Sequence, residues 1–243
     1  MSVSRCGPLA AWSNAFVAGQ VSLDQVVDAV VASRAQRQVH GLPDADALGD
    51  VVVAWRRAGS PVRVVLPVPG DVRGVSGPDR FRRAALDAGE AAHAAALGVV
   101  PQVVERGPSS APPGVQWQAF ALEPAPADHQ SVEDAQYELG TAIRESASAL
   151  AAADVAGSGV DVPDALQGAR RAGERLNLPP GHPQGAVRLL AQAERMQTVL
   201  DLARTDPVSG ALERGVAVRH SVLRELATAV RRARMAGYNA VAY

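Results

Sequence analysis

The chain has 243 residues, of which 47% are hydrophobic and 4% aromatic, and its 24 basic and 25 acidic residues give a formal net charge of −1. This charge balance excludes a general nucleic-acid binder, the apolar fraction excludes a disordered chain, and no apolar run approaches the ~18 residues of a membrane helix. All the basic residues are arginines, which excludes P-loop and Schiff-base chemistry, because both require a lysine.

The N-terminus and the cysteine content indicate a cellular compartment. The single cysteine, Cys6, excludes an internal disulfide framework and favours a reducing compartment. The N-terminal apolar stretch is interrupted at Trp12 and is followed by no small-residue cleavage site, so it lacks the pattern of a secretory signal. We therefore expect a cytoplasmic protein.

Helices are predicted before residue 60. Ser22 and Gln25 form a capping-box pattern, and valines follow them at helical spacing. A further helix is predicted around residues 48–55, where apolar residues fall at i, i+3, i+4 and i+7. Gly59 is placed to end this helix in a left-handed conformation.

The next segment has the character of strands. Residues 61–68 are β-branched and bounded by prolines, and residues 99–104 and 115–122 predict two further strands. A helix is predicted from about residue 78 to residue 88, because a proline suits the first helical turn. Residues 89–96 fit either state, since their alanines favour a helix and the flanking glycines suggest a strand.

The proline-rich segment at 123–127 is the predicted domain boundary. Beyond it only helices are expected, at about 131–153, 163–176, 183–203 and 212–237, the last two forming an antiparallel hairpin. The sequence therefore predicts an α+β fold. A small sheet packed with helices forms residues 1–125, and an α-helical bundle forms residues 126–243.

The stripes of the predicted bundle are rich in alanine, so each helix buries little apolar area. We expect the helical half to complete its core against the first half or against a second copy of the chain. The predicted partner is therefore the chain itself, with a dimer favoured. A different protein partner is the alternative, and neither a membrane nor nucleic acid is expected.

The glycine-rich segment before residue 80 is the predicted binding site. A strand, a loop and a helix N-terminus in this order can hold an anion, and arginines can add bidentate contacts to phosphate or carboxylate. The segment matches neither the P-loop nor the dinucleotide fingerprint, and its aspartates oppose an anion, so a plain surface turn is the alternative. The predicted anion-binding residues are Gly70, Asp71, Arg73, Gly74, Ser76, Gly77 and Arg80.

Two histidine–carboxylate spacings, Glu90 with His93 and His129 with Glu133, suggest metal ligands. A di-iron bundle would need two Glu-x-x-His units and two further glutamates, and the chain has one such unit and no cysteine–histidine zinc pattern. We therefore predict no metal and no cofactor. No serine elbow or Cys–His arrangement is present either, so no catalytic residue is predicted and a non-enzyme is favoured.

The C-terminal helix carries six arginines. Arg224, Arg231, Arg232 and Arg234 form a candidate basic patch for nucleic acid or an acidic partner. Because the helix dipole favours positive charge at a C-terminus and no aromatic ladder accompanies the arginines, a solvated helix face is the preferred interpretation.

Three segments, LPVPGDVRG at 66–74, LPPGHPQGAVRLLA at 178–191 and MAGYNA at 235–240, resemble segments of an uncharacterised actinobacterial protein family. This resemblance covers most of the chain and implies no activity, cofactor or catalytic residue. We expect a non-catalytic cytoplasmic interaction or oligomerisation protein. The alternatives are a small-molecule or anion-binding protein, including an enzyme, that uses the 70–78 loop, and a nucleic-acid binder that uses the C-terminal arginines.

Overall fold

A computed structural model describes residues 4–31, 38–42, 46–104, 114–123, 130–152, 176–205 and 213–241. The chain forms two compact units. The N-terminal unit comprises residues 2–129 together with 177–183 and 238–243, and the helical unit comprises residues 130–176 and 184–237. No helix among the described residues is long and apolar enough to cross a membrane.

Three helices of the N-terminal unit pack on one another: α1 (Cys6–Val17), α2 (Leu23–Val30) and α3 (Leu48–Ala58). The capping box predicted at the start of α2 is confirmed, because the backbone N–H of Gln25 donates to Ser22 Oγ at 3.2 Å and that of Ser22 donates to Gln25 Oε1 at 2.8 Å. Helix α3 ends at Gly59, whose φ of 65° is the predicted left-handed cap.

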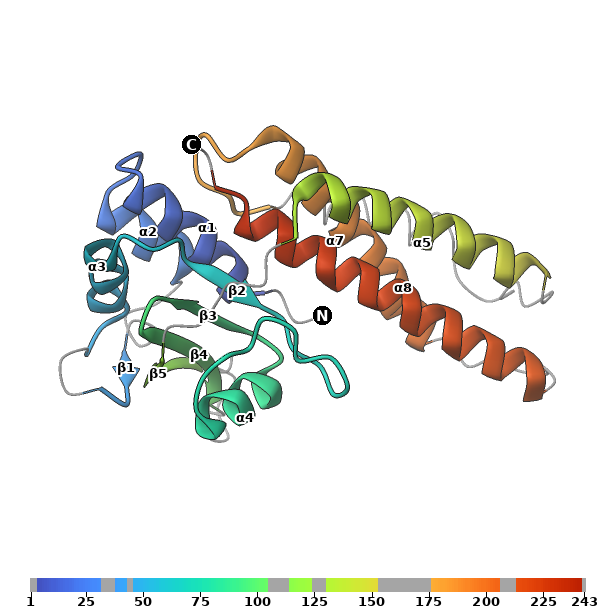
Figure 1. Cartoon of the computed structure of the whole chain (residues 1–243), viewed down its shortest axis with the longest axis horizontal. Helices are drawn as coiled ribbons and strands as arrows, with labels where there is room; N and C mark the ends of the chain where they lie inside the picture. The colour runs from blue at the N-terminus through green and yellow to red at the C-terminus, as the bar shows by residue number, and fades with distance from the viewer. Residues whose placement is uncertain are drawn as a thin grey trace. The chain divides into compact units, whose positions relative to one another are not determined.

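Five strands form one mixed sheet in the order β1-β5-β4-β3-β2, in which only the β1–β5 pair is parallel (Figure 1). The strands are β1 (Val39–His40), β2 (Arg63–Val65), β3 (Ala91–Ala94), β4 (Leu97–Val104) and β5 (Gly114–Ala121). The ambiguous segment 89–96 thus contains a strand. Hydrogen-bonded neighbours on both sides of β3 outweigh the helical propensity of its alanines.

Helices cover both faces of this sheet (Figure 1). On one face lies α4 (Asp79–Ala88), whose buried Phe81 packs edge-to-face on Phe120 with ring centroids 5.5 Å apart. Gly98 permits this approach, because a Cβ there would lie 2.9 Å from the Phe81 ring. On the other face, buried Trp55 of α3 donates its indole N–H to the carbonyl oxygen of Leu97 at 3.0 Å.

Two asparagine side chains pair with the backbone at and just before the edge strand β2. The backbone N–H of Val62 donates to Asn14 Oδ1 at 2.7 Å, and Asn14 Nδ2 donates to the Val62 carbonyl oxygen at 2.9 Å. Asn239, close to the C-terminus, makes the same pair of bonds with Val64, at 2.7 and 3.0 Å. These amides occupy backbone groups that an additional strand would otherwise pair with.

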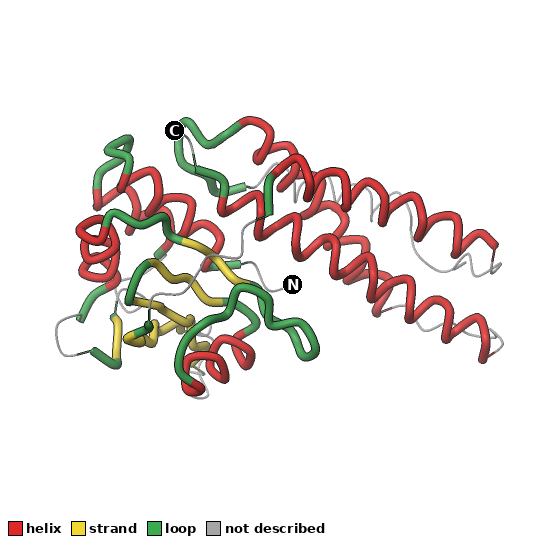
Figure 2. The backbone as a smooth tube through the Cα atoms, in the orientation of Figure 1, coloured by secondary structure: helices red, strands yellow, loops and turns green. Residues whose placement is uncertain are grey.

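The helical unit is built from α5 (Val132–Ala152), α7 (Gln184–Thr205) and α8 (Glu213–Asn239), the long red tubes of Figure 2. All three helices contribute to one apolar core, whose buried members are Ala135, Leu139, Leu189, Ala193, Leu200, Leu226, Val230, Ala233 and Ala236. The predicted helix at 163–176 and the turn before α8 lie almost entirely outside the described residues.

Contacts between α7 and α8 show that they run antiparallel, as predicted. Arg219 near the start of α8 donates to the carbonyl oxygen of Ala203 near the end of α7 at 2.7 Å. Arg234 near the end of α8 pairs with Glu194 in the middle of α7. The two helices come very close at Gly237, where a Cβ would lie 2.5 Å from Leu190 Cγ.

Candidate functional site

The glycine-rich loop is a turn closed by its own backbone. The N–H of Val68 donates to the carbonyl oxygen of Asp71 at 3.0 Å, and the N–H of Asp71 donates back to Val68 at 2.9 Å. Gly70, with a φ of 87°, takes the left-handed position in this turn. The N–H of Arg73 donates to Asp71 Oδ1 at 3.3 Å, so an aspartate of the loop accepts from a backbone amide that the predicted site would have offered to an anion.

Beyond this loop, an open groove of about 670 Å³ lies against α4 and β4. We call it the arginine groove. Its lining residues are Arg5, Arg80, Arg83, Ala84, Asp87, Ala88, Glu90, Val100, Pro101, Gln102 and Val103. Of the seven residues predicted to bind an anion, only Arg80 lines the groove. The structure therefore separates Arg80 from Arg73 and groups it with other arginines.

One face of α4 forms a wall of the groove. Arg80, Arg83, Ala84 and Asp87 fall at i, i+3, i+4 and i+7, which places them on the same side of a helix. Both arginines are exposed, and neither makes a hydrogen bond or an ion pair with any described residue. By contrast, Arg82 does not line the groove and pairs with Asp79 on its own helix.

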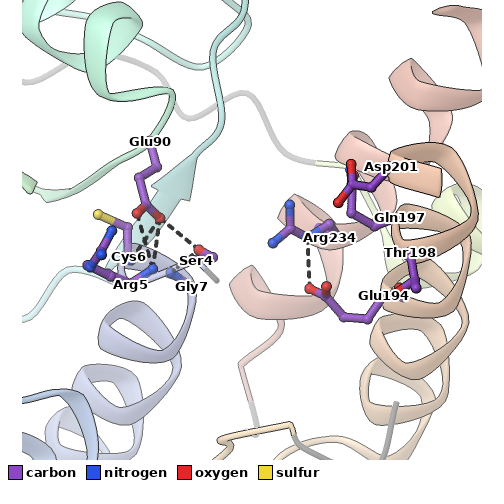
Figure 3. A network of polar contacts seen from close by, with 10 residues as sticks. All are labelled: Ser4, Arg5, Cys6, Gly7, Glu90, Glu194, Gln197, Thr198, Asp201 and Arg234. Atoms are coloured by element: carbon purple, nitrogen blue, oxygen red, sulfur yellow. Dashed lines mark hydrogen bonds and ion pairs between the residues drawn. The ribbon is translucent and has the colours of Figure 1, made fainter. Parts of the chain in front are cut away.

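The N-terminus of α1 forms a second wall, where a buried carboxylate receives four donor contacts (Figure 3). Glu90, 6% exposed, accepts from the Ser4 hydroxyl at 2.8 Å and from the backbone N–H of Cys6 at 3.0 Å. The backbone N–H of Arg5 lies 3.1 and 3.0 Å from its two carboxylate oxygens. A carboxylate at a helix N-terminus satisfies free amides and complements the helix dipole, so this network fixes the backbone that carries Arg5.

The network also determines the state of the one cysteine. Burial raises the pKa of the Cys6 thiol well above its ordinary value, and the nearby negative charge of Glu90 raises it further. Because the thiolate is the reactive form, the buried neutral thiol is a poor nucleophile. Cys6 therefore has a packing role beside the groove.

The sheet supplies the remaining surface of the groove through β4. Val100 and Pro101 are buried and apolar, whereas Gln102 is exposed and its amide group contacts that of Gln118 on β5. Val103 is 57% exposed, which is high for a large apolar side chain. The groove thus combines guanidinium groups with apolar surface, and small-molecule sites likewise combine an apolar lining with a few polar groups.

The strand geometry separates Glu90 from His93, the pair whose spacing suggested a metal site. Successive residues of a strand point to opposite faces, so Glu90 lies toward α1 while His93 lies on the face of Gly98 and α4. Burial, followed by the positive charge of Arg63, lowers the pKa of His93 to about 4. Within the described ranges no group of three potential metal ligands occurs. His129, the other predicted candidate, lies outside those ranges.

The four arginines of the predicted basic patch do not form one exposed surface. Arg224 is exposed, but Arg231 is buried. Arg232 lies 4.0 Å from Glu138 of α5, and Arg234 Nε donates to Glu194 Oε1 at 2.8 Å (Figure 3). These two pairs join α8 to α5 and to α7.

Sequence reasoning missed Arg5 and Arg83. The spacing of Arg83 from Arg80 was a usable signal, because the two lie one helical turn apart. Arg5 carried no such signal, since it precedes Glu90 by 85 residues and only the folded chain brings them together.

These features define a two-unit protein, with an α+β unit that carries an arginine-lined groove and a helical unit whose described residues form α5, α7 and α8. The chain belongs to the Rv1486c-like protein family, whose N-terminal domain matches residues 6–132 and whose C-terminal domain matches residues 133–235. The predicted resemblance to an uncharacterised actinobacterial family is thereby confirmed.

The relatives match the chain over nearly their whole length. It is 30% identical to Uncharacterized protein Rv1486c of Mycobacterium tuberculosis over 276 aligned positions, which cover 96% of this chain and 95% of that protein. It is 25% identical to Uncharacterized protein ML1804 of Mycobacterium leprae and 28% identical to Uncharacterized protein MAV321 of Mycobacterium avium, with the same coverage. No solved structure matches the chain.

Proposed function

We propose that this chain is a non-catalytic binding protein that holds a small organic anion, bearing phosphate or carboxylate groups, in the arginine groove. The observation that carries the proposal is the convergence of Arg5, Arg80 and Arg83 on one groove. Their guanidinium groups make no hydrogen bond or ion pair within the described part of the chain. Guanidinium groups bind phosphate and carboxylate bidentately, so unpartnered ones gathered at one site favour an anionic ligand.

The size and composition of the groove support a small molecule rather than a large partner. Its volume of about 670 Å³ falls within the ~300–1,000 Å³ of sites for small ligands. The lining carries three guanidinium groups and the carboxylates of Asp87 and Glu90, so its formal charge is +1. Because Glu90 accepts from the N-terminus of α1, the charge that a ligand meets is more positive than this sum.

The test is a thermal-shift and calorimetric titration of the full chain with inorganic phosphate, pyrophosphate and citrate. We expect at least one of these anions to raise the melting temperature. The changes Arg80→Gln and Arg83→Gln should each weaken its binding at least about tenfold, because each removes a charge-assisted hydrogen bond.

Matched arginine variants locate the site. Arg57→Gln removes an exposed arginine of α3 that does not line the groove, and it should leave binding unchanged. Arg73→Gln separates the groove from the glycine-rich loop. If Arg73→Gln weakened binding while Arg80→Gln and Arg83→Gln did not, the groove would be the wrong site.

A second candidate function is self-association through the helical unit, with a dimer favoured. The observation behind it is Tyr137 of α5, which is 74% exposed, the highest value among the large apolar side chains of the described residues. Aromatic side chains are enriched at protein interfaces. Light scattering across protein concentration should give a dimer mass that Tyr137→Glu reduces to a monomer mass, and a concentration-independent monomer would contradict this function. We place both functions in the cytoplasm, on the ground of the single cysteine.

A further inference from the structure

We propose that the arginine groove selects ligands that carry an ammonium or amino donor in addition to their anionic groups, and that Asp87 is the residue that makes this selection. The inference rests on the proposed anion-binding function. The two carboxylates of the groove have different roles.

The carboxylate of Glu90 is committed to the protein. It is 6% exposed, and its oxygens accept from the Ser4 hydroxyl and from the backbone N–H groups of Arg5 and Cys6. A carboxylate with this many internal donors has little capacity left for a ligand. The second carboxylate, Asp87, is therefore the acceptor that a ligand in the groove would meet.

Asp87 is exposed, lines the groove, and has no hydrogen bond or ion pair with any described residue. It follows Arg83 by four residues, a spacing at which helical ion pairs form, yet the two side chains are not paired. Both charges consequently remain available on the same helix face. At 1.5 Å of rise per residue, the backbone positions of these two residues lie about 6 Å apart along the helix axis.

A purely anionic ligand held by Arg80 and Arg83 would meet repulsion from Asp87. A ligand with an ammonium group about 5–6 Å from its anion would instead place that group at the carboxylate, one helical turn further on. The same side chain then penalises one class of ligand and stabilises the other, which is how discrimination by charge operates. Amino acids whose side chain carries a carboxylate or a phosphate group have this arrangement.

The experiment uses two pairs of probes that differ at one carbon. O-phosphoserine carries an ammonium group where 3-phosphoglycerate carries a hydroxyl, and glutamate carries one where glutarate carries only hydrogen. Affinities are measured by calorimetry on the full chain at one salt concentration, because salt screens the charges involved. The wild-type protein should bind the aminated member of each pair about tenfold more tightly, as a charge-assisted hydrogen bond predicts. Asp87→Asn should abolish this preference and should strengthen binding of 3-phosphoglycerate and glutarate.

The control is Asp79→Asn, which makes the same change of charge on the same helix at an exposed residue outside the groove lining. It should keep the preference of the wild-type protein. If 3-phosphoglycerate or glutarate bound in an Arg80-dependent manner but Asp87→Asn left the ratio within each pair unchanged, the selection by Asp87 would be overturned and the anion site would stand. If neither these probes nor the inorganic anions bound the wild-type protein, the proposed function and this inference would both fall.

Discussion

At the scale of single residues, the chain places titratable groups in very different surroundings over a few positions. Glu90 is buried, and the N-terminus of α1 supplies donors to its carboxylate. His93, three residues later, lies on the opposite face of the sheet, where burial and Arg63 oppose a positive charge. The surroundings of the His93 ring therefore favour its neutral form, whereas hydrogen-bond donors surround the carboxylate of Glu90.

His93 should make stability depend on pH. Its folded-state pKa of about 4 lies below the ordinary value of 6.5, so between these values the unfolded chain binds a proton that the folded chain does not. Stability should therefore fall as the pH falls from about 6.5 to about 4, by up to about 1.4 kcal/mol per pH unit, and should be free of this effect above that window. Urea unfolding at several pH values measures the slope.

In the His93→Gln variant this part of the pH dependence should disappear, whatever the variant does to absolute stability. His40→Gln, at an exposed residue of β1, is the matched control and should retain it. Equal slopes in the wild-type protein and in His93→Gln would contradict the assignment.

At the scale of elements, the β2 edge is closed by side chains rather than by another strand. Asn239 is 7% exposed and gives both an acceptor and a donor to the backbone of Val64. An amide group can do this because its oxygen accepts and its nitrogen donates, in the same way as a peptide group. A residue near the C-terminus thus completes the hydrogen bonding of a strand that begins at residue 63.

Replacement of Asn239 should lower the free energy of unfolding more than an ordinary surface substitution does. Asn239→Ala leaves a buried N–H and a buried carbonyl oxygen of Val64 without these partners, so we expect a loss of about 2–3 kcal/mol in the free energy of unfolding. Asn239→Asp should be nearly as harmful, because a carboxylate cannot donate to the Val64 carbonyl oxygen. Denaturation followed by tryptophan fluorescence measures both. A loss below 0.5 kcal/mol, roughly the range of surface substitutions, would show that the edge does not need this amide.

At the scale of the whole molecule, the two units do not follow the order of the chain. Residues 177–183 and 238–243 belong to the N-terminal unit although helices of the other unit separate them from it in sequence. Asn177 illustrates this, since its Oδ1 accepts from Trp12 Nε1 at 3.0 Å. The domain boundary at residue 125 stays a prediction.

The three tryptophans, Trp12, Trp55 and Trp117, all lie in the N-terminal unit, which allows the units to be monitored separately. Leu139 is fully buried in the core of the helical unit, so Leu139→Ala creates a cavity there. This change should lower the free energy of unfolding of that unit by about 2–5 kcal/mol. We expect the transition seen by circular dichroism at 222 nm to shift while the tryptophan fluorescence transition stays in place, because each unit has its own core. An equal shift of both signals would show that the chain unfolds as one cooperative body.

How far the sequence predicts this protein depends on how local the determining interactions are. The capping box at Ser22, the left-handed cap at Gly59 and the long bundle helices follow from residues within one or two turns of each other, and they were predicted. Strand β3 could not be assigned, because its alanines favour a helix and only its two neighbouring strands hold it extended.

The candidate site shows the same limit. Arg80 was predicted from its place at a helix start, and its neighbour Arg83 was within reach of the same helical spacing. Arg5 lines the same groove only because the chain folds, and so does the hydrogen bonding of Glu90 to the N-terminus of α1. Both depend on contacts between segments about 85 residues apart. The sequence by itself thus determined the α+β architecture and most of the helices, because short-range hydrogen bonding and hydrophobic periodicity encode them. It indicated the family through the resemblance of three of its segments. Only the tertiary structure decided where the unpartnered arginines gather, because no local pattern records which distant segments pack together.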